Sequence, residues 1–80
     1  MPVVFRYKGF RFFFYSNEGS PREPVHVLVR AGGSEAKIWL KLQAVVATSY
    51  GYDAGRLREL VDVAQTNSQL IERAWHDCFG

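Results

Sequence analysis

A histidine with two neighbouring cations is the arrangement in this sequence that comes closest to a catalytic site. Side chains alternate along a strand, so His26 and Arg30 share one face of a predicted strand, and Lys37 belongs to the next strand. Such a histidine could take a proton from a ribose 2′-hydroxyl while Arg30 or Lys37 stabilises the phosphate. A metal-independent ribonuclease is therefore one hypothesis, but the same residues also describe a structural histidine on an ordinary surface.

The same face is predicted to carry a larger set of cations and flat rings. Cations attract phosphates and rings stack on unpaired bases, which is typical of platforms for single-stranded nucleic acid. Trp, Tyr and Arg are also favoured in protein interfaces, and the rings could instead simply cover their own sheet. The candidate binding residues are Arg11, Phe13, Tyr15, His26, Arg30, Lys37, Trp39 and Lys41.

No metal or cofactor site is predicted. His76 and Cys78 are two positions apart on a predicted helix and so point to different sides, whereas Zn²⁺ needs three or four converging ligands. The Gly32-Gly33-Ser34 segment lacks the lysine and the strand-to-helix context of a phosphate-binding loop, so we interpret it as a hairpin turn. We therefore expect neither metal nor cofactor.

Four short runs rich in Val, Phe, Tyr and Ile must position these side chains. Turn signals at 8–9, 17–21 and 31–34 separate strands expected at about 3–7, 10–16, 25–30 and 35–42. The short links require neighbouring strands to pair as antiparallel hairpins. The pattern leaves the segment 43–52 open, because Ala44-Val45-Val46-Ala47 fits a strand end, a short helix or a packed loop.

The other face of these strands is almost entirely apolar and is expected to form the core. Burying its large side chains contributes roughly 1.5 to 3 kcal/mol each. The expected core residues of the strands are Val3, Phe5, Tyr7, Phe10, Phe12, Phe14, Val25, Val27, Val29, Ala36, Ile38, Leu40 and Leu42.

Helices are expected in the second half of the chain. Leu57, Leu60, Val61 and Ala64 have helical spacing after a plausible N-cap at Asp53, and the pattern resumes from about residue 67 to the C-terminus. One bent helix is the alternative to two. The predicted fold is α+β: one domain over 1–80, with a four-stranded antiparallel β-meander over 1–42 and a helical hairpin over 53–80 that packs on one face of the sheet.

Composition bounds the function classes. The 80 residues are 48% hydrophobic and 22% charged, which indicates a globular domain, and one of this size buries only about 63% of its surface, so a homodimer or another partner would stabilise it. Residues 1–41 carry a net charge of +4 and residues 42–80 a net charge of −2. A single cysteine and the lack of a long apolar run favour a cytoplasmic protein without a membrane segment.

Several segments together resemble one family. They are residues 1–6, the phenylalanine-rich stretch 11–19 with its Ser-Asn-Glu-Gly turn, residues 23–27, the Ala-Lys-x-Trp-Leu strand at 36–40, and Ala74-Trp75-His76. The chain resembles the bacterial domain of unknown function 4160 family over nearly its whole length. The resemblance implies a toxin–antitoxin component, a role assigned by gene context, with a small domain of unknown function 2442 protein as partner.

One departure from the family pattern bears on chemistry. The family typically has His-x-His after the proline of the third strand, and here His26 fits the first position while Leu28 occupies the second. We therefore expect a non-catalytic module that binds a small partner protein through the basic and aromatic sheet face or a strand edge. The alternative is a small RNA-directed toxin, either an RNA binder or a ribonuclease that uses His26.

Overall fold

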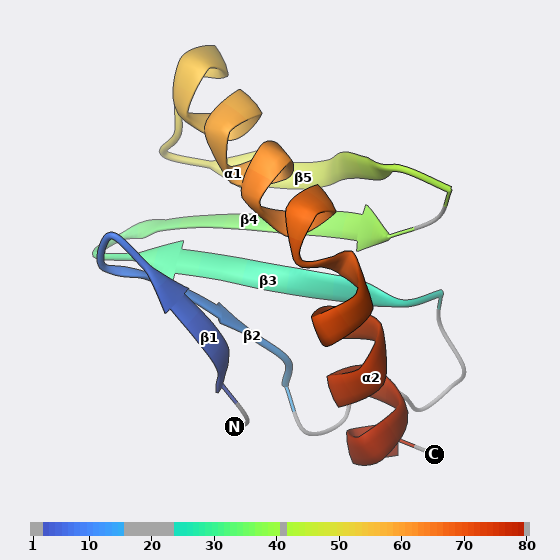
Figure 1. The fold of residues 1–80 in the computed structure, drawn as a ribbon. Helices are drawn as coiled ribbons and strands as arrows, with labels where there is room; N and C mark the ends of the chain where they lie inside the picture. Colours follow the sequence, from blue (N-terminus) through green and yellow to red (C-terminus); the bar gives the residue numbers. More distant parts are fainter. Residues whose placement is uncertain (1–2, 16–23, 41, 80) are drawn as a thin grey trace.

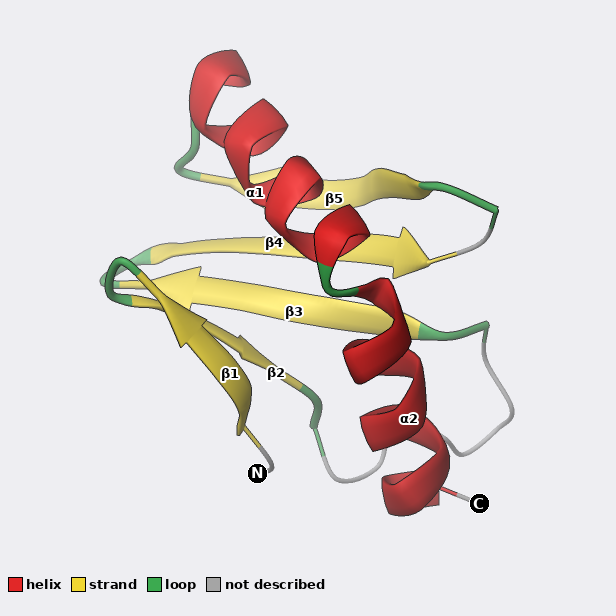
Figure 2. Cartoon of the chain, in the orientation of Figure 1, coloured by secondary structure: helices red, strands yellow, loops and turns green. Residues whose placement is uncertain are grey.

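The computed structural model describes residues 3–15, 24–40 and 42–79. Its elements are the strands β1 (Val3–Tyr7), β2 (Phe10–Phe13), β3 (His26–Ala31), β4 (Ser34–Leu40) and β5 (Ala44–Tyr50), followed by the helices α1 (Ala54–Thr66) and α2 (Ser68–Phe79). The strands form one antiparallel sheet in the order β1-β2-β3-β4-β5. The α+β class and the meander are confirmed, and the helices lie on one face of the sheet (Figures 1 and 2).

The predicted number of strands is wrong, because the sheet has a fifth strand where the sequence left a choice. In β5, Val45 pairs with Trp39 and Val46 with Ile38, and the register then shifts before Thr48 pairs with Lys37. This irregularity breaks the alternation of side chains on which a sequence-based assignment depends.

The core lies between the helices and the sheet. Phe12, Val27 and Ile38 from the sheet are buried against Leu60 of α1 and Ile71 of α2. Ile71 and Trp75 are one helical turn apart, so α2 presents both to the sheet. Most of the predicted core is thus found where the alternation placed it.

Two residues of the predicted core are misplaced. Val3 is 41% exposed, because a register shift between Val3 and Phe5 lets Val4 pack against the core together with Phe5. Leu42 is fully exposed because β4 ends at Leu40 and Leu42 lies in the connection to β5.

The helical segment bends at Asn67. Asp53 caps α1 as predicted, its carboxylate accepting a hydrogen bond from the Arg56 N–H at 2.7 Å. The Asn67 N–H donates to the Val63 carbonyl and the Ile71 N–H donates to the Asn67 carbonyl, so helical hydrogen bonding runs through the bend. α2 therefore continues along the sheet from the end of α1 and does not fold back on it (Figure 1).

A side-chain contact anchors β5 to the helical layer. The Ala44 N–H donates to Oε1 of Gln65 at 2.6 Å, and α1 packs over β4 and β5. This contact fixes the start of the last strand against α1 and leaves the outer edge of that strand at the end of the sheet.

Candidate functional site

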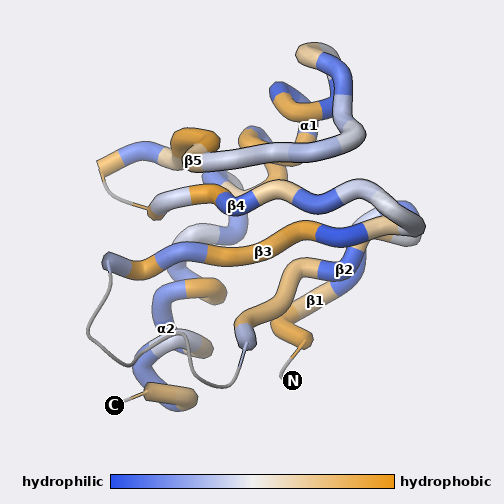
Figure 3. Tube along the Cα trace, turned by 180° about the vertical axis from the view of Figure 1, so that it is seen from behind, coloured by the Kyte–Doolittle hydropathy of each residue, from blue (hydrophilic) through white to orange (hydrophobic). Residues whose placement is uncertain are grey.

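The face of the sheet without helices carries a row of paired residues that crosses all five strands. Arg6 pairs with Arg11, Arg11 with Arg30, Arg30 with Glu35, and Glu35 with Tyr50. Directly paired residues project to the same face. Three arginines from neighbouring strands are therefore side by side with one glutamate and one tyrosine. We call these five residues, Arg6, Arg11, Arg30, Glu35 and Tyr50, the arginine row. Figure 3 shows the hydrophilic stretches of β1, β2 and β3 next to one another from this side.

Arg30 is held by an internal network. Its Nε donates to Oε1 of Glu35 at 2.9 Å, and its Nη2 donates to the Tyr15 hydroxyl at 2.6 Å. The guanidinium also lies 5.6 Å from the centre of the Phe13 ring. The hydrogen bond and the charge of Glu35 raise the pKa of Arg30 above its ordinary value. Arg30 therefore has a structural role on this face as well as a positive charge.

Arg6 and Arg11 are placed differently from Arg30. No carboxylate among the described residues lies within 4.0 Å of either guanidinium, and no hydrogen bond from either one occurs within the described parts of the chain. Arg6 is exposed and Arg11 is partly exposed. With Glu35 balancing one of three arginines, the row has a net charge of +2 by formal charge.

The remaining rings on this face are largely packed against one another. Phe13 is 1% exposed and meets the Tyr15 ring edge-on, with ring centres 5.3 Å apart. The Lys37 ammonium lies 4.6 Å from the centre of the Trp39 ring, which is partly buried. Phe13 therefore offers no open ring face, and Trp39 is already covered in part by a cation.

His26 is buried at the start of β3. Its ring centre lies 5.3 Å from that of Trp39 and 4.9 Å from that of Trp75, and its Nδ1 is 3.1 Å from the Pro24 carbonyl oxygen. The ring is 0% exposed. A general base must come within hydrogen-bond reach of its substrate, and this burial keeps the imidazole away from the surface.

The structure thus divides the candidate binding residues. Arg11, Tyr15, Lys37 and Trp39 are partly exposed on the predicted face, as is Arg30. Phe13 is buried on that face, His26 pairs with Trp39 there but its buried ring also packs against Trp75 of α2, and Lys41 lies outside the described residues.

The candidate set omitted three residues of the row. Arg6 and Tyr50 are exposed, and Glu35 neutralises Arg30. Alternation along β4 places Glu35 on the face of Lys37, so this residue could have been found from the sequence. Tyr50 could not, because its strand was not predicted.

The two edges of the sheet differ in character. The β1 edge is short, contains a register shift, and carries Arg6 and Lys8 at or next to the strand. The β5 edge lies within an uncharged stretch that runs from Leu42 to Tyr52. Exposed apolar side chains accompany it: Leu42 is fully exposed, Tyr50 is 75% exposed and Val45 is 40% exposed.

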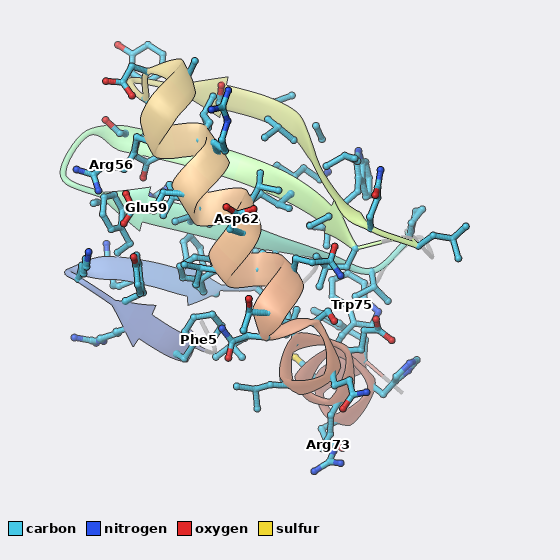
Figure 4. The ribbon with its side chains drawn as sticks, turned by 45° about the horizontal axis from the view of Figure 1, so that its top comes forward. Phe5, Arg56, Glu59, Asp62, Arg73 and Trp75 are labelled. Atoms are coloured by element: carbon cyan, nitrogen blue, oxygen red, sulfur yellow. The ribbon has the colours of Figure 1, made fainter. Side chains whose placement is uncertain are left out.

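A groove of about 550 Å³ lies between the end of β1 and α1. Glu59 lines it and accepts hydrogen bonds from the Tyr7 hydroxyl at 2.6 Å and from Arg56 at 2.7 Å, while the Lys8 ammonium lies at 3.6 Å. The Tyr7 hydrogen bond is the main reason that the pKa of Glu59 is below its ordinary value. Figure 4 shows Arg56 and Glu59 together on α1. This carboxylate is thus used to join the hairpin to the helix.

Three further features concern metals and membranes. Within the described residues, no group of three or more His, Cys, Asp or Glu side chains is placed to hold a metal ion. His76 and Cys78 are both exposed on α2. In the described part of the chain, neither helix is long and apolar enough to cross a membrane.

Comparison with known proteins identifies one family. The family model described as a domain of unknown function (DUF4160) matches residues 9–76. The comparisons with curated proteins and with solved structures gave no match. The matched range includes four of the five strands, together with α1 and most of α2.

Proposed function

This chain belongs to the DUF4160 family, and we propose that it is a non-catalytic interaction module that takes up a strand of a small partner protein on the β5 edge. The observation that carries the proposal is the uncharged edge strand with exposed apolar side chains. An edge strand presents a row of N–H and C=O groups that can pair with another chain. A partner strand gains main-chain hydrogen bonds there, and its alternate side chains gain contacts with the flanking apolar groups.

The β5 edge is better suited to this role than the β1 edge. Proteins protect edges with charge, proline or short strands, and β1 combines a short strand with nearby cations. β5 has seven residues and none of them is charged or a proline. The irregularity that would disturb strand addition at this edge is the register shift in its pairing with β4. An incoming strand therefore meets no charge within β5 itself.

The packing of the sheet face also favours the edge as the site of partner binding. Phe13 and His26 are buried, and Arg30 is held by Glu35 and Tyr15. These side chains are already buried or bound by other groups of the protein, so fewer of them are available as anchors for a partner protein.

We extend the proposal to the biological setting. The module acts in the bacterial cytoplasm as one component of a toxin–antitoxin-like pair, and its partner is a protein of the domain of unknown function 2442 family. The support for this setting is the resemblance of the sequence to a family with that gene context. A second copy of the chain is the other occupant that the β5 edge could take, which would give a homodimer.

The burial of His26 weakens the support for the alternative ribonuclease. The imidazole lies between two tryptophan rings, and Leu28 occupies the position of the family's second histidine and is itself buried. A second histidine in hydrogen-bond reach of a substrate is therefore missing from this part of β3. A ribonuclease activity lost in His26→Ala would reverse this conclusion.

Co-expression with the neighbouring gene product tests the proposal. We expect the tagged chain to co-purify with a domain of unknown function 2442 protein, and Val45→Lys to abolish this because it places a charge at the edge, where it opposes strand addition. Gln69→Lys is the matched control, since it adds the same charge at an exposed position of α2.

Each outcome has a defined meaning. Co-purification that survives Val45→Lys at the same stoichiometry would refute the β5 edge as the binding site. A dimeric mass of the chain alone by light scattering, lost in Val45→Lys but kept in Gln69→Lys, would identify a second copy as the occupant.

A further inference from the structure

Three arginines of the arginine row are held at regular spacing by the sheet. Arg6, Arg11 and Arg30 occupy directly paired positions on β1, β2 and β3. Neighbouring strands are about 4.8 Å apart, so the three backbone positions span about 10 Å across the sheet. The row thus presents guanidinium groups along a line perpendicular to the strands.

This placement is unfavourable for the isolated sheet. Like charges at directly paired positions destabilise a sheet, and opposite charges stabilise it. Glu35 compensates Arg30, but among the described residues no carboxylate compensates Arg6 or Arg11. An anion bound along the row would relieve this repulsion and use the forked guanidinium groups as phosphate ligands.

Rings on the same face favour a nucleic acid as the anion. Tyr50 ends the row on β5 with 75% of its surface exposed and supplies an open ring. Trp39 lies further along β4, partly exposed and covered in part by Lys37. Exposed rings can stack on unpaired bases, and sheet faces that combine rings with cations are a common way to bind single-stranded RNA. An acidic peptide would need the cations but would have less use for the rings.

We propose that the arginine row binds the phosphate backbone of single-stranded RNA that crosses the sheet from β1 toward β5. Arg6 and Arg11 contact phosphates directly, and Arg30, fixed by Glu35 and Tyr15, contributes a third contact. The three arginines on β1, β2 and β3 lie away from the β5 edge proposed for the partner protein, and the two sites share Tyr50.

Salt dependence measures the number of phosphate contacts. For single strands the slope of log K against log salt concentration is about −0.7 per contact, so three contacts predict about an 18-fold loss of affinity between 50 and 200 mM salt. Removing two of them by Arg6→Gln with Arg11→Gln predicts only about a threefold loss. The measurement is fluorescence anisotropy with a labelled 12-nucleotide oligouridylate.

The matched control removes the same charge from the helical layer. Arg58→Gln with Arg73→Gln changes two exposed arginines of α1 and α2, and Arg73 points away from the sheet (Figure 4). We expect this variant to keep the salt slope of the unchanged protein. Equal flattening in both double variants would overturn the proposal, because the effect would then follow net charge alone.

Two further measurements complete the test. Arg6→Lys with Arg11→Lys keeps both charges and should retain most of the salt slope, so a proposal based on phosphate contacts fails if this variant behaves like the glutamine variant. Competition by oligoglutamate as strong as that by unlabelled oligouridylate would identify an acidic peptide site instead. The glutamine variant should unfold at the same temperature as the unchanged protein or higher, since it removes paired like charges.

Discussion

Trp75, together with Ile71, packs α2 against the sheet, and its substitution tests this packing. The indole is 6% exposed and its ring centre lies 5.2 Å from that of Phe14, 4.5 Å from that of Phe79 and 4.9 Å from that of His26. Trp75→Ala removes all three ring contacts and leaves a cavity under the helix. Trp39, which is only partly buried on the opposite face of the sheet, provides the matched tryptophan for comparison.

The size of the effect can be worked out from this burial. A large aromatic side chain buries about 150–250 Å², which at about 25 cal/mol per Å² corresponds to roughly 4 to 6 kcal/mol. Alanine keeps the β-carbon, and substitutions of this kind cost about 3 to 5 kcal/mol. We expect Trp75→Ala to lower the free energy of unfolding by about 4 kcal/mol. A chain of 80 residues has roughly 4 to 12 kcal/mol in total, so the variant is at or near the limit of folding.

Urea unfolding followed by far-UV circular dichroism measures this change without relying on tryptophan fluorescence. With a slope near 1 kcal/mol per molar urea, the midpoint should fall by about 4 M in Trp75→Ala. Trp39→Ala should lose only about 1 kcal/mol, in the range of ordinary substitutions. Equal losses in the two variants would refute the assignment of Trp75 to the core and of Trp39 to the helix-free face.

Two other predictions concern the turn after β5 and the groove beside α1. Gly51 has a φ of +84°, and a β-carbon there would lie 2.9 Å from the Ser34 β-carbon. Gly51→Ala should therefore lower the thermal unfolding midpoint more than Gly32→Ala, because Gly32 has a φ of +57° but open space around it. Equal midpoints for the two variants would contradict this. Tyr7→Phe should raise the pKa of Glu59 toward its ordinary value of 4.5, measured by NMR titration. A carboxyl group with a lowered pKa stabilises the fold above its ordinary pKa and loses this contribution as the pH falls. The unchanged protein should therefore lose more stability than Tyr7→Phe below about pH 4.5. Parallel acid unfolding curves of the two proteins would rule this out.

Much of the fold follows from local patterns in the sequence. Alternation gave the four strands that have a continuous apolar face, and helical spacing with Asp53 as N-cap gave the start of α1. β5 could not be assigned in this way, because Val45 and Val46 are adjacent apolar residues that are both partly exposed at an edge. For a related reason Val4, and not the predicted Val3, packs against the core. The register shift that causes this depends on the partner strand and cannot be recognised from the local sequence pattern.

For the candidate site too, the sequence predicted the face on which a side chain lies but not its burial or its contacts. The sequence predicted which side chains share the helix-free face, but the burial of Phe13 and His26 depends on neighbours brought in from β3, β4 and α2. The pairing of Arg30 with Glu35 required the register of the β3–β4 hairpin. The line formed by Arg6, Arg11 and Arg30 required the registers of two hairpins at once.

The order of the elements along the chain has a consequence for biosynthesis. Each strand pairs only with its neighbours in sequence, so every pairing is local in the chain, and the longest connection to be closed is the segment 14–25 between β2 and β3. The helical layer that covers the apolar face comes after all five strands. At about 5 to 20 residues per second, translation of this layer takes roughly 1 to 5 s. Until this layer has been made, the chain has no helices to cover Phe12, Val27 and Ile38, and a chaperone that binds apolar surface would have its substrate there.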